Sequence, residues 1–325
     1  LAVPVATSLN GKDTIPGTHP LSVGVVGTYS RASANRVVGA ADLVLFVGTT
    51  TGGMTTHFWQ VPPIGRRAVQ IDIDPEALGR NYPLELAICA DARMALERMT
   101  KLAQASDHGP QTWAEHAAGV VSEWRKEWLH RTAADDLPMR PERLATDLSR
   151  LTPEDAIVVV DTGHAGMWMG GFYDVRDPGQ SYLRSAGHLG WAFPASLGAK
   201  CANPERPVVC FTGDSGLWYH VAEIETAVRF GINTITVVND NHSGNQSMRG
   251  FDRAYGGKQT ERARELWVFT EVDFARLAED IGAMGIRVER PEQFEPAMDR
   301  ALDATRPVVI DVVTDIEAVA PTAVV

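Results

Sequence analysis

Three polar turns in the second half of the chain carry residue types that bind metal ions or anions. They are Thr162-Gly163-His164, Gly213-Asp214-Ser215-Gly216 and Asn239-Asp240-Asn241, and each follows a short apolar run. Such runs are typical of parallel strands that are buried on both faces. Because ligands of an open parallel sheet lie beyond the carboxyl ends of its strands, we expect the three turns to meet at one site.

The turn around Asp214 has the composition of a phosphate-binding loop. Gly213 and Gly216 lack a Cβ, so backbone N–H groups there can approach an anion closely. A helix that we expect to start around Leu217 would aim its positive end at the same place. Asp214 would repel an anion unless a cation lay between them. Mg²⁺ accepts carboxylate, amide and phosphate oxygens, and Asn241 can supply the amide oxygen, so we predict a diphosphate bound through Mg²⁺.

The apolar runs and the helical segments between them predict an α/β fold with two doubly wound parallel-sheet domains. Residues 1–103 form the first domain, residues 104–137 a linker with a connecting helix at 112–131, and residues 138–325 the second domain. In the first domain we expect strands at 3–7, 43–47, 68–73 and 87–89 and helices at 33–41, 75–79 and 92–103. In the second we expect strands at AIVVV, PVVCFT, TITVVN and VVIDVV, with a helix before Gly231 and two late helices.

Composition excludes some classes of function. The chain has 30 basic and 41 acidic residues and a net charge of −11, which argues against binding nucleic acid or anionic membranes. No apolar run approaches the length of a membrane span, and no signal peptide is visible. The three cysteines, Cys89, Cys201 and Cys210, form no CxxC motif, so we expect buried free thiols and a cytoplasmic protein.

The turns also resemble a known signature. Gly213-Asp214-Ser215, with Asn241 following 27 residues after Asp214, is similar to the GDG…NN motif of thiamine-diphosphate enzymes. Segments such as HPLSVGVVG and VQIDIDPEALGRN resemble the middle domain of acetolactate synthase-type enzymes. GHLGWAFPASLGAKCANPERPVVCFTGDSG resembles their diphosphate-binding (PP) domain. The resemblance covers nearly the whole chain and implies thiamine diphosphate and Mg²⁺ as cofactors.

The resemblance assigns roles to individual residues. Asp214, Asn241 and the main-chain carbonyl of Ser243 match the Mg²⁺ ligands. Leu189 matches the apolar wedge under the cofactor's thiazolium ring, and the Gly187 carbonyl matches the acceptor for the aminopyrimidine. The residues expected to contact the cofactor are Gly163, His164, Gly187, Leu189, Gly213, Asp214, Ser215, Gly216, Asn241, Ser243 and Gly244.

Two positions depart from the family pattern, and several histidines have two interpretations. Ser215 replaces the usual glycine, and Asp240 replaces the usual first asparagine, which places an extra negative charge near the metal. His188, beside the wedge and grouped with Leu189 and Gly187 as a catalytic candidate, could contact substrate or only line the pocket, and the same holds for His164. His220, His57 and Trp59 are expected to be structural.

The resemblance also implies a missing part. In this family an activating glutamate lies in an N-terminal pyrimidine-binding (PYR) domain. The chain shows no such domain, and residues 1–5 resemble the second strand of the middle domain, so the first strand and helix of that domain are missing too. Glu223 and Glu225 lie in the wrong domain for the activating role. We therefore expect a separate chain to supply the PYR domain and the start of the middle domain, within a hetero-oligomer.

The expected function is C–C bond cleavage or formation next to the carbonyl of a 2-oxo acid or 2-hydroxy ketone. Carboligation, decarboxylation and lyase cleavage remain open. FAD is not expected, because the turn GTTTGGMTTHF lacks the arginine of flavin-binding relatives. The alternatives are a non-catalytic cofactor-binding or regulatory subunit and a simple 2-oxo acid decarboxylase. A nucleotide-binding module in residues 1–103 is weaker, since no GxGxxG opens a helix there. Residues 256–269 could form a lid.

Overall fold

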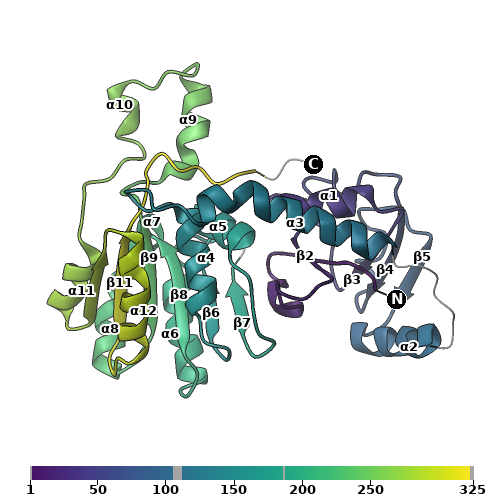
Figure 1. Ribbon diagram of the computed structural model, residues 1–325, viewed down its shortest axis with the longest axis horizontal. Coiled ribbons are helices and arrows are strands. Elements are labelled where there is room, and N and C mark those ends of the chain that lie inside the picture. The colour runs from purple at the N-terminus through teal and green to yellow at the C-terminus, as the bar shows by residue number, and fades with distance from the viewer. Residues whose placement is uncertain (1, 105–111, 186, 323–325) are drawn as a thin grey trace. The chain divides into compact units, whose positions relative to one another are not determined.

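The computed structural model describes residues 2–104, 112–185 and 187–322, and it divides into two compact units (Figure 1). Unit 1 comprises Leu1–Glu127 and Thr322–Val325, and unit 2 comprises Trp128–Pro321. The boundary falls inside α3 (Thr112–Thr132), the helix that the sequence predicted as a connecting element. Most of the linker segment that precedes this helix, residues 105–111, lies outside the described residues.

Unit 1 contains two separate parallel sheets. A two-stranded sheet pairs β1 with β2, and a three-stranded sheet has the order β3-β4-β5. Helix α1 follows β2, and α2 follows β5. The elements are β1 (Val5–Thr7), η1 (Lys12–Thr14), β2 (Ser22–Val25), α1 (Ala32–Ala40), β3 (Leu43–Val47), β4 (Arg67–Asp72), β5 (Leu86–Cys89) and α2 (Ala92–Gln104).

Two expectations for unit 1 were wrong. The helix expected at 75–79 is a series of turns, because Asp72 and Asp74 side chains accept hydrogen bonds from the backbone N–H groups of Asp74 and Glu76. Such local bonds compete with helix formation. Strand β2 was not expected, since its run is short and contains Gly24. This glycine is required: its φ is +98°, and a Cβ would meet Arg31 Cδ at 2.8 Å.

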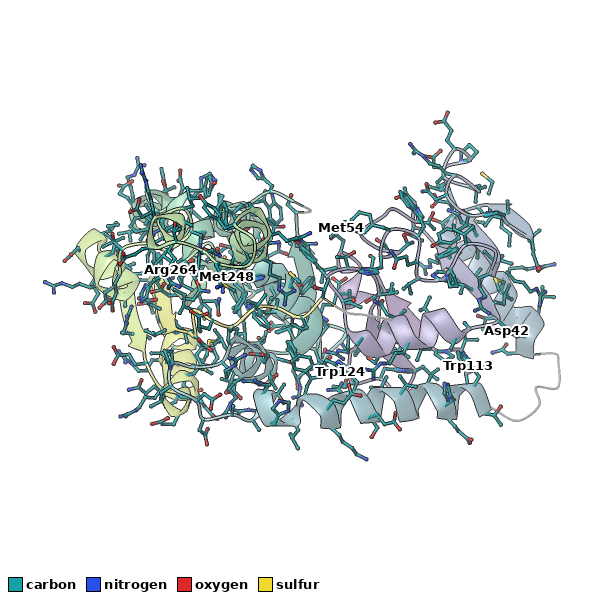
Figure 2. The ribbon with its side chains drawn as sticks, turned by 90° about the horizontal axis from the view of Figure 1, so that it is seen from above. Asp42, Met54, Trp113, Trp124, Met248 and Arg264 are labelled. Atoms are coloured by element: carbon teal, nitrogen blue, oxygen red, sulfur yellow. The ribbon has the colours of Figure 1, made fainter. Side chains whose placement is uncertain are left out.

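The core of unit 1 joins β2 and α1 to the first part of α3. Val23, Ala34, Val37 and Ala117 form a buried apolar cluster. Arg31 is also buried, and its guanidinium lies 4.6 Å from the ring centre of Trp124 (labelled on α3 in Figure 2). A cation over an indole face is favourable, and this contact helps to attach α3 to the unit.

Unit 2 is a six-stranded parallel sheet with the order β10-β11-β9-β8-β6-β7 (Figure 1). Helices cover both faces, so the doubly wound architecture is confirmed for this unit. Its strands are β6 (Ile157–Val160), β7 (Ser181–Arg184), β8 (Val208–Gly213), β9 (Ile235–Asp240), β10 (Met284–Val288) and β11 (Val308–Val313). Its helices include α4 (Pro141–Leu151), α5 (His164–Phe172), α6 (Ala192–Ala202), α7 (Asp214–Trp218), α8 (Glu223–Phe230), α9 (Met248–Ala254), α10 (Glu261–Arg264), α11 (Phe274–Ile281) and α12 (Phe294–Leu302).

The sequence predicted the four buried strands of unit 2, which are β6, β8, β9 and β11. It did not predict the two partly exposed strands, β7 and β10. The apolar runs of β6, β8, β9 and β11 pack against α6, α8 and α11 in one continuous cluster. Strands β7 (SYLR) and β10 (MGIRV) lie at the two edges of the sheet, where partial exposure permits polar residues. Their sequences therefore carry no clear alternation or apolar run.

The sequence also predicted the end of one helix, the start of another and the burial of the cysteines. Helix α8 ends at Gly231 in the left-handed conformation (φ +63°), as predicted. The helix expected near Leu217 instead begins at Asp214, as the short α7. All three cysteines are free, but Cys89 and Cys201 are exposed and Cys210 alone of the three is buried, so burial was wrong for two of them. No helix among the described residues is long and apolar enough to cross a bilayer.

Candidate functional site

The three oxygen ligands proposed for a metal lie together at the carboxyl edge of the unit 2 sheet. Strand β8 ends at Gly213, directly before Asp214, and its neighbour β9 ends at Asp240, directly before Asn241. Asp214 Oδ2 accepts a hydrogen bond from the N–H of Ser243 at 2.7 Å, and Asn241 Oδ1 accepts from the same group at 3.2 Å. One backbone N–H therefore holds both side-chain ligands close together.

The chain reverses sharply between the second and third ligands. His242 has a φ of +53°, a left-handed conformation that is uncommon for residues other than glycine. Its N–H donates to Asp240 Oδ1 at 3.1 Å. This turn directs the N–H of Ser243 toward Asp214. The hydroxyl of Ser215 lies 3.5 Å from the carbonyl oxygen of Ser243, so the third proposed ligand lies beside the same turn.

Carboxylates accumulate behind these ligands. Burial raises the pKa of Asp214 to about 6. Burial and the charge of Asp214 raise the pKa of Asp240 to about 7, and burial and the charge of Asp240 raise the pKa of Asp311 to about 7. Arg287 faces them: its guanidinium pairs with Asp311 at 2.5 Å and lies 3.6 Å from Asp240. Three carboxyl groups against one guanidinium make a site that favours an added cation.

The donor set fits a small hard cation. It consists of a carboxylate, an amide oxygen and a main-chain carbonyl, all buried and without sulfur or imidazole. Among the described residues, no group of three or more His, Cys, Asp or Glu side chains is placed to bind a metal by itself. The three oxygens of the donor set fit Mg²⁺, which would take its further oxygens from a ligand.

The turn after β6 contributes Gly163 and His164. Gly163 has a φ of +72°, and a Cβ there would meet the Gln246 side chain at 2.7 Å. His164 Nδ1 lies 2.6 Å from Asn245 Oδ1, and Asn245 Nδ2 donates to the carbonyls of Ile316 and Ala318. Burial lowers the pKa of His164 to about 4, although the bond to Asn245 acts in the opposite direction. His164 is therefore neutral near pH 7.

The turn 187–190 contains the proposed wedge. Gly187 and Gly190 have φ values of +78° and +87°. Gly187 and His188 are exposed, Leu189 is half-buried, and a Cβ on Gly163 would lie 4.0 Å from Leu189 Cδ1. The Gly190 N–H donates to both carboxylate oxygens of Asp161, at 3.0 and 3.1 Å. The structure thus brings the turns of Gly163 and Leu189 together.

Residues 256–269, where a lid was expected, contact the loop that carries the proposed ligands Asn241 and Ser243. Gly244 N donates to Trp267 O, and Phe269 N donates to His242 O, both at 2.7 Å. Trp267 is buried, and Arg264 of α10 (labelled in Figure 2) lies 5.2 Å from its ring centre. These two hydrogen bonds hold Gly244 and the nearby His242 in place from a segment that lies later in the chain.

Several candidates lie elsewhere. Asn239 points to the sheet face opposite Asp240, because side chains alternate along a strand. His220 lies half-buried after α7. His57 and Trp59 belong to unit 1, where His57 Nδ1 contacts Thr28 Oγ1 and Trp59 Nε1 donates to Thr51 O.

Sequence reasoning missed four residues that support the site. Asp161 and Asn245 tie turns together, and Arg287 and Asp311 lie behind Asp240. The signal for Asp161 was visible, since it lies directly between the end of β6 and the first polar turn. Arg287 and Asp311 are paired across β10 and β11. Strand β10 was not expected from the sequence, so that pairing could not be anticipated.

The fold and the site define a class of enzyme that binds a phosphorylated cofactor at the carboxyl edge of a parallel sheet. The family model "Thiamine pyrophosphate enzyme, C-terminal TPP binding domain" matches residues 161–312, and the model of the central domain matches residues 1–99. The chain therefore belongs to the thiamine pyrophosphate enzyme family, as the resemblance predicted.

Curated relatives narrow the class further. The acetolactate synthase isozyme 3 large subunit of Escherichia coli is 29% identical over 97% of this chain and 55% of its own length. The acetolactate synthase large subunit of Haemophilus influenzae is 28% identical over 93% and 52%. The sulfoacetaldehyde acetyltransferase of Castellaniella defragrans is 28% identical over 94% and 54%. The chain spans about half the length of the curated relatives that it matches.

Proposed function

We propose that unit 2 binds thiamine diphosphate through Mg²⁺ and acts in the cleavage or formation of a C–C bond next to a carbonyl. One observation carries the proposal: Asp214, Asn241 and Ser243 are buried and meet around a single backbone N–H, with further buried carboxylates behind them. A diphosphate ligand would complete the coordination of a hard cation there.

The chain's own residues would bind and orient the cofactor. Asp214, Asn241 and the Ser243 carbonyl would hold the metal. Gly163, His164, Ser215 and Gly216 would face the diphosphate, with Gly213 and Gly244 shaping the backbone around it. Leu189, Gly187 and His188 would face the reacting end. When bound, thiamine diphosphate supplies a centre that stabilises negative charge on a carbonyl carbon.

The substrate class follows from the family and the names of relatives. We propose a 2-oxo acid or a 2-hydroxy ketone, with joining of two carbon fragments as the main reaction, since relatives are named acetolactate synthase and acetyltransferase. The protein would then be a thiamine-diphosphate-dependent lyase or transferase. A simple decarboxylase or a non-catalytic cofactor-binding subunit remains as the alternative that activity measurements would distinguish.

We propose that a separate chain carries the PYR domain and the start of the middle domain, as half of a split, hetero-oligomeric enzyme in the cytoplasm. The strand order in unit 1 supports the proposal that the first strand of this domain belongs to the other chain. A doubly wound sheet of order 3-2-1-4-5-6 that lacks strand 1 leaves one pair and one triplet of strands. Unit 1 has this arrangement, β1-β2 and β3-β4-β5. Strand β3 reads LVLFV, yet none of its residues is buried.

The cofactor site is tested by titrating thiamine diphosphate into the full chain with and without Mg²⁺. Binding by the native chain should require Mg²⁺, and Asp214→Ala should abolish the Mg²⁺-dependent part. Glu225→Ala is the matched control, since it removes an exposed carboxylate from the neighbouring α8. An Asp214→Ala protein with unchanged affinity would show that the metal assignment is wrong.

The split is tested by native mass measurement of the purified protein together with an assay of 2-oxo acid turnover. We expect activity to depend on a second polypeptide. A chain that is active and stable by itself would contradict the split enzyme and leave the cofactor proposal standing.

A further inference from the structure

We propose that Asp161 is a positioning residue that fixes the turn 187–190, and with it Leu189, against the diphosphate-binding turns. The inference rests on the proposed function and adds to it a residue that lies outside the metal and diphosphate contacts. Asp161 follows β6 directly, and its side chain is 1% exposed. Its carboxylate lies where three turns meet.

Each of these turns donates a hydrogen bond to Asp161. Oδ1 accepts from the N–H of Thr162 at 2.8 Å and from the N–H of Gly190 at 3.0 Å. Oδ2 accepts from the same Gly190 N–H at 3.1 Å and from the hydroxyl of Thr212 at 2.8 Å. Thr162 precedes Gly163 and His164, Gly190 follows Leu189, and Thr212 precedes Gly213 and Asp214. The carboxylate thus joins three of the turns that the cofactor is proposed to touch, but not the turn of Asn241 and Ser243.

The packing around this carboxylate leaves no room for adjustment. A Cβ on Gly216 would collide with Asp161 Oδ2 and the Thr212 hydroxyl, and a Cβ on Gly190 would meet Tyr219 Cβ at 2.8 Å. Gly216 therefore lets the backbone approach the carboxylate directly, and Gly190 lets turn 187–190 pack against Tyr219. Within the described residues, turn 187–190 has one other backbone hydrogen bond, the long one from Trp191 N to His188 O at 3.4 Å. We therefore expect the bonds to Asp161, together with the packing of Gly190 against Tyr219, to fix the position of this turn.

Burial of the Asp161 carboxylate is unfavourable for the free energy of folding unless its charge is compensated. Burial raises the pKa of Asp161, while the bonds from Thr162, Thr212 and Gly190 act to lower it. Burying a charge is unfavourable unless hydrogen bonds satisfy it, and here they converge from separate turns. If Asp161 served only to stabilise the fold, its loss would weaken all ligands of the site alike. As a positioning residue, it should affect most the ligand that reaches Leu189.

The experiment compares two probes on the full chain, both with Mg²⁺: thiamine diphosphate, and inorganic diphosphate, which reaches the metal and diphosphate turns but not Leu189. Asp161→Ala should lower the affinity for thiamine diphosphate by about 10- to 100-fold, the typical effect of losing a hydrogen bond to a buried charged group. The affinity for inorganic diphosphate should change by less than about 3-fold, because the described hydrogen bonds of Asp161 go to Thr162, Gly190 and Thr212 and to no proposed metal ligand.

Conservative variants separate positioning from charge. Asp161→Asn keeps an acceptor for Gly190, while Thr212 can turn its hydroxyl to the Gly213 carbonyl, 3.1 Å away. It should retain thiamine diphosphate affinity within about 5-fold. Asp161→Glu keeps the charge but displaces it by a methylene, so it should lose affinity as Asp161→Ala does. It also serves if Asp161→Ala fails to fold. Thr212→Val, which leaves the Gly190 bond intact, is the matched control.

The outcomes distinguish the two proposals. Equal losses for both probes, or full thiamine diphosphate affinity in Asp161→Ala and Asp161→Glu, would overturn the positioning role. A native chain that binds neither probe in the presence of Mg²⁺ would instead refute the proposed function. Hydrogen exchange of the Gly190 amide provides a readout without cofactor: it should be protected in the native chain and in Asp161→Asn, and should exchange faster in Asp161→Glu.

Discussion

Strands β3 and β6 have nearly the same kind of sequence but different surroundings. Strand β3 reads LVLFV and has no buried residue, whereas β6 reads IVVV and is buried throughout. Strand β6 lies inside a six-stranded sheet with helices on both faces, and β3 is the edge of a three-stranded sheet. The comparison shows that an apolar run predicts a strand that requires burial. The neighbouring strands and helices determine whether the strand is in fact buried.

The largest expected difference between the two units comes from removing a phenylalanine ring from each sheet. Phe211 in β8 is fully buried, whereas Phe46 in β3 is half-buried and contacts Tyr82 at a ring-centre distance of 5.2 Å. Phe211→Ala should reduce the free energy of unfolding by about 3–5 kcal/mol and Phe46→Ala by about 1–2 kcal/mol. Urea unfolding followed by circular dichroism measures both. Equal losses would mean that β3 is covered in solution.

A second contrast concerns ion pairs. Arg287 is mostly buried and faces Asp311 and Asp240, whereas Arg67 pairs with Glu85 on the surface of unit 1. Arg287→Met should destabilise unit 2 by about 2–4 kcal/mol, because buried carboxylates lose their compensating charge. Arg67→Met should leave the unfolding midpoint unchanged within error, since exposed pairs contribute little. A tolerated Arg287→Met would show that water already solvates the carboxyl cluster.

The same carboxyl cluster predicts how the stability of unit 2 depends on pH in the absence of metal. The pKa values of Asp214, Asp240 and Asp311 are raised to about 6, 7 and 7. The folded state therefore binds more protons than the unfolded state between pH 4 and 7. Its free energy of unfolding should fall by about 1 kcal/mol or more per pH unit as pH rises through this window, and level off above it.

Thermal unfolding in chelator from pH 5 to 8 measures this slope, and Asp311→Asn, which removes one titrating group, should flatten it. Added Mg²⁺ should restore stability most at the alkaline end, where Asp214 is ionised. A slope of opposite sign would contradict the proposed burial of these groups.

The smallest expected changes in the free energy of unfolding come from two glycine substitutions. In both, the added Cβ would lie in open space. Gly231 ends α8 at a φ of +63°, and Gly119 lies inside α3 in unit 1. Gly231→Ala should lower the free energy of unfolding by about 1 kcal/mol, because a left-handed conformation is costly for alanine. Gly119→Ala should raise it by about 0.5–1 kcal/mol, because alanine favours the helix. The two melting temperatures should move in opposite directions.

Much of the fold could be predicted from local pattern, and the exceptions have physical reasons. The buried strands β6, β8, β9 and β11 are apolar runs, which burial on both faces requires. Edge strands β7 and β10 are mixed in polarity because only part of each is covered. The helix expected at 75–79 failed because Asp72 and Asp74 bond to the backbone and form turns instead.

The candidate site also contains residues that local sequence pattern predicted and residues that it did not. Asp214, Asn241 and Ser243 lie in turns whose spacing and composition indicate their chemistry, so sequence sufficed to propose them. Asp161, Asn245 and Arg287 act through residues distant in sequence, and their partners follow only from the sheet order and the turn geometry. Such support is a property of the assembled structure, so no local pattern encodes it.

Asn245 has a consequence for the heat of cofactor binding. Both hydrogens of its Nδ2 are used by the carbonyls of Ile316 and Ala318, so Oδ1 must accept the proton that His164 carries on Nδ1. The Nε2 of the neutral imidazole then holds a lone pair and has nothing to donate. A diphosphate oxygen bound at Nε2 would require His164 to take up a proton from the buffer. Calorimetry in two buffers of different ionisation enthalpy would count that proton.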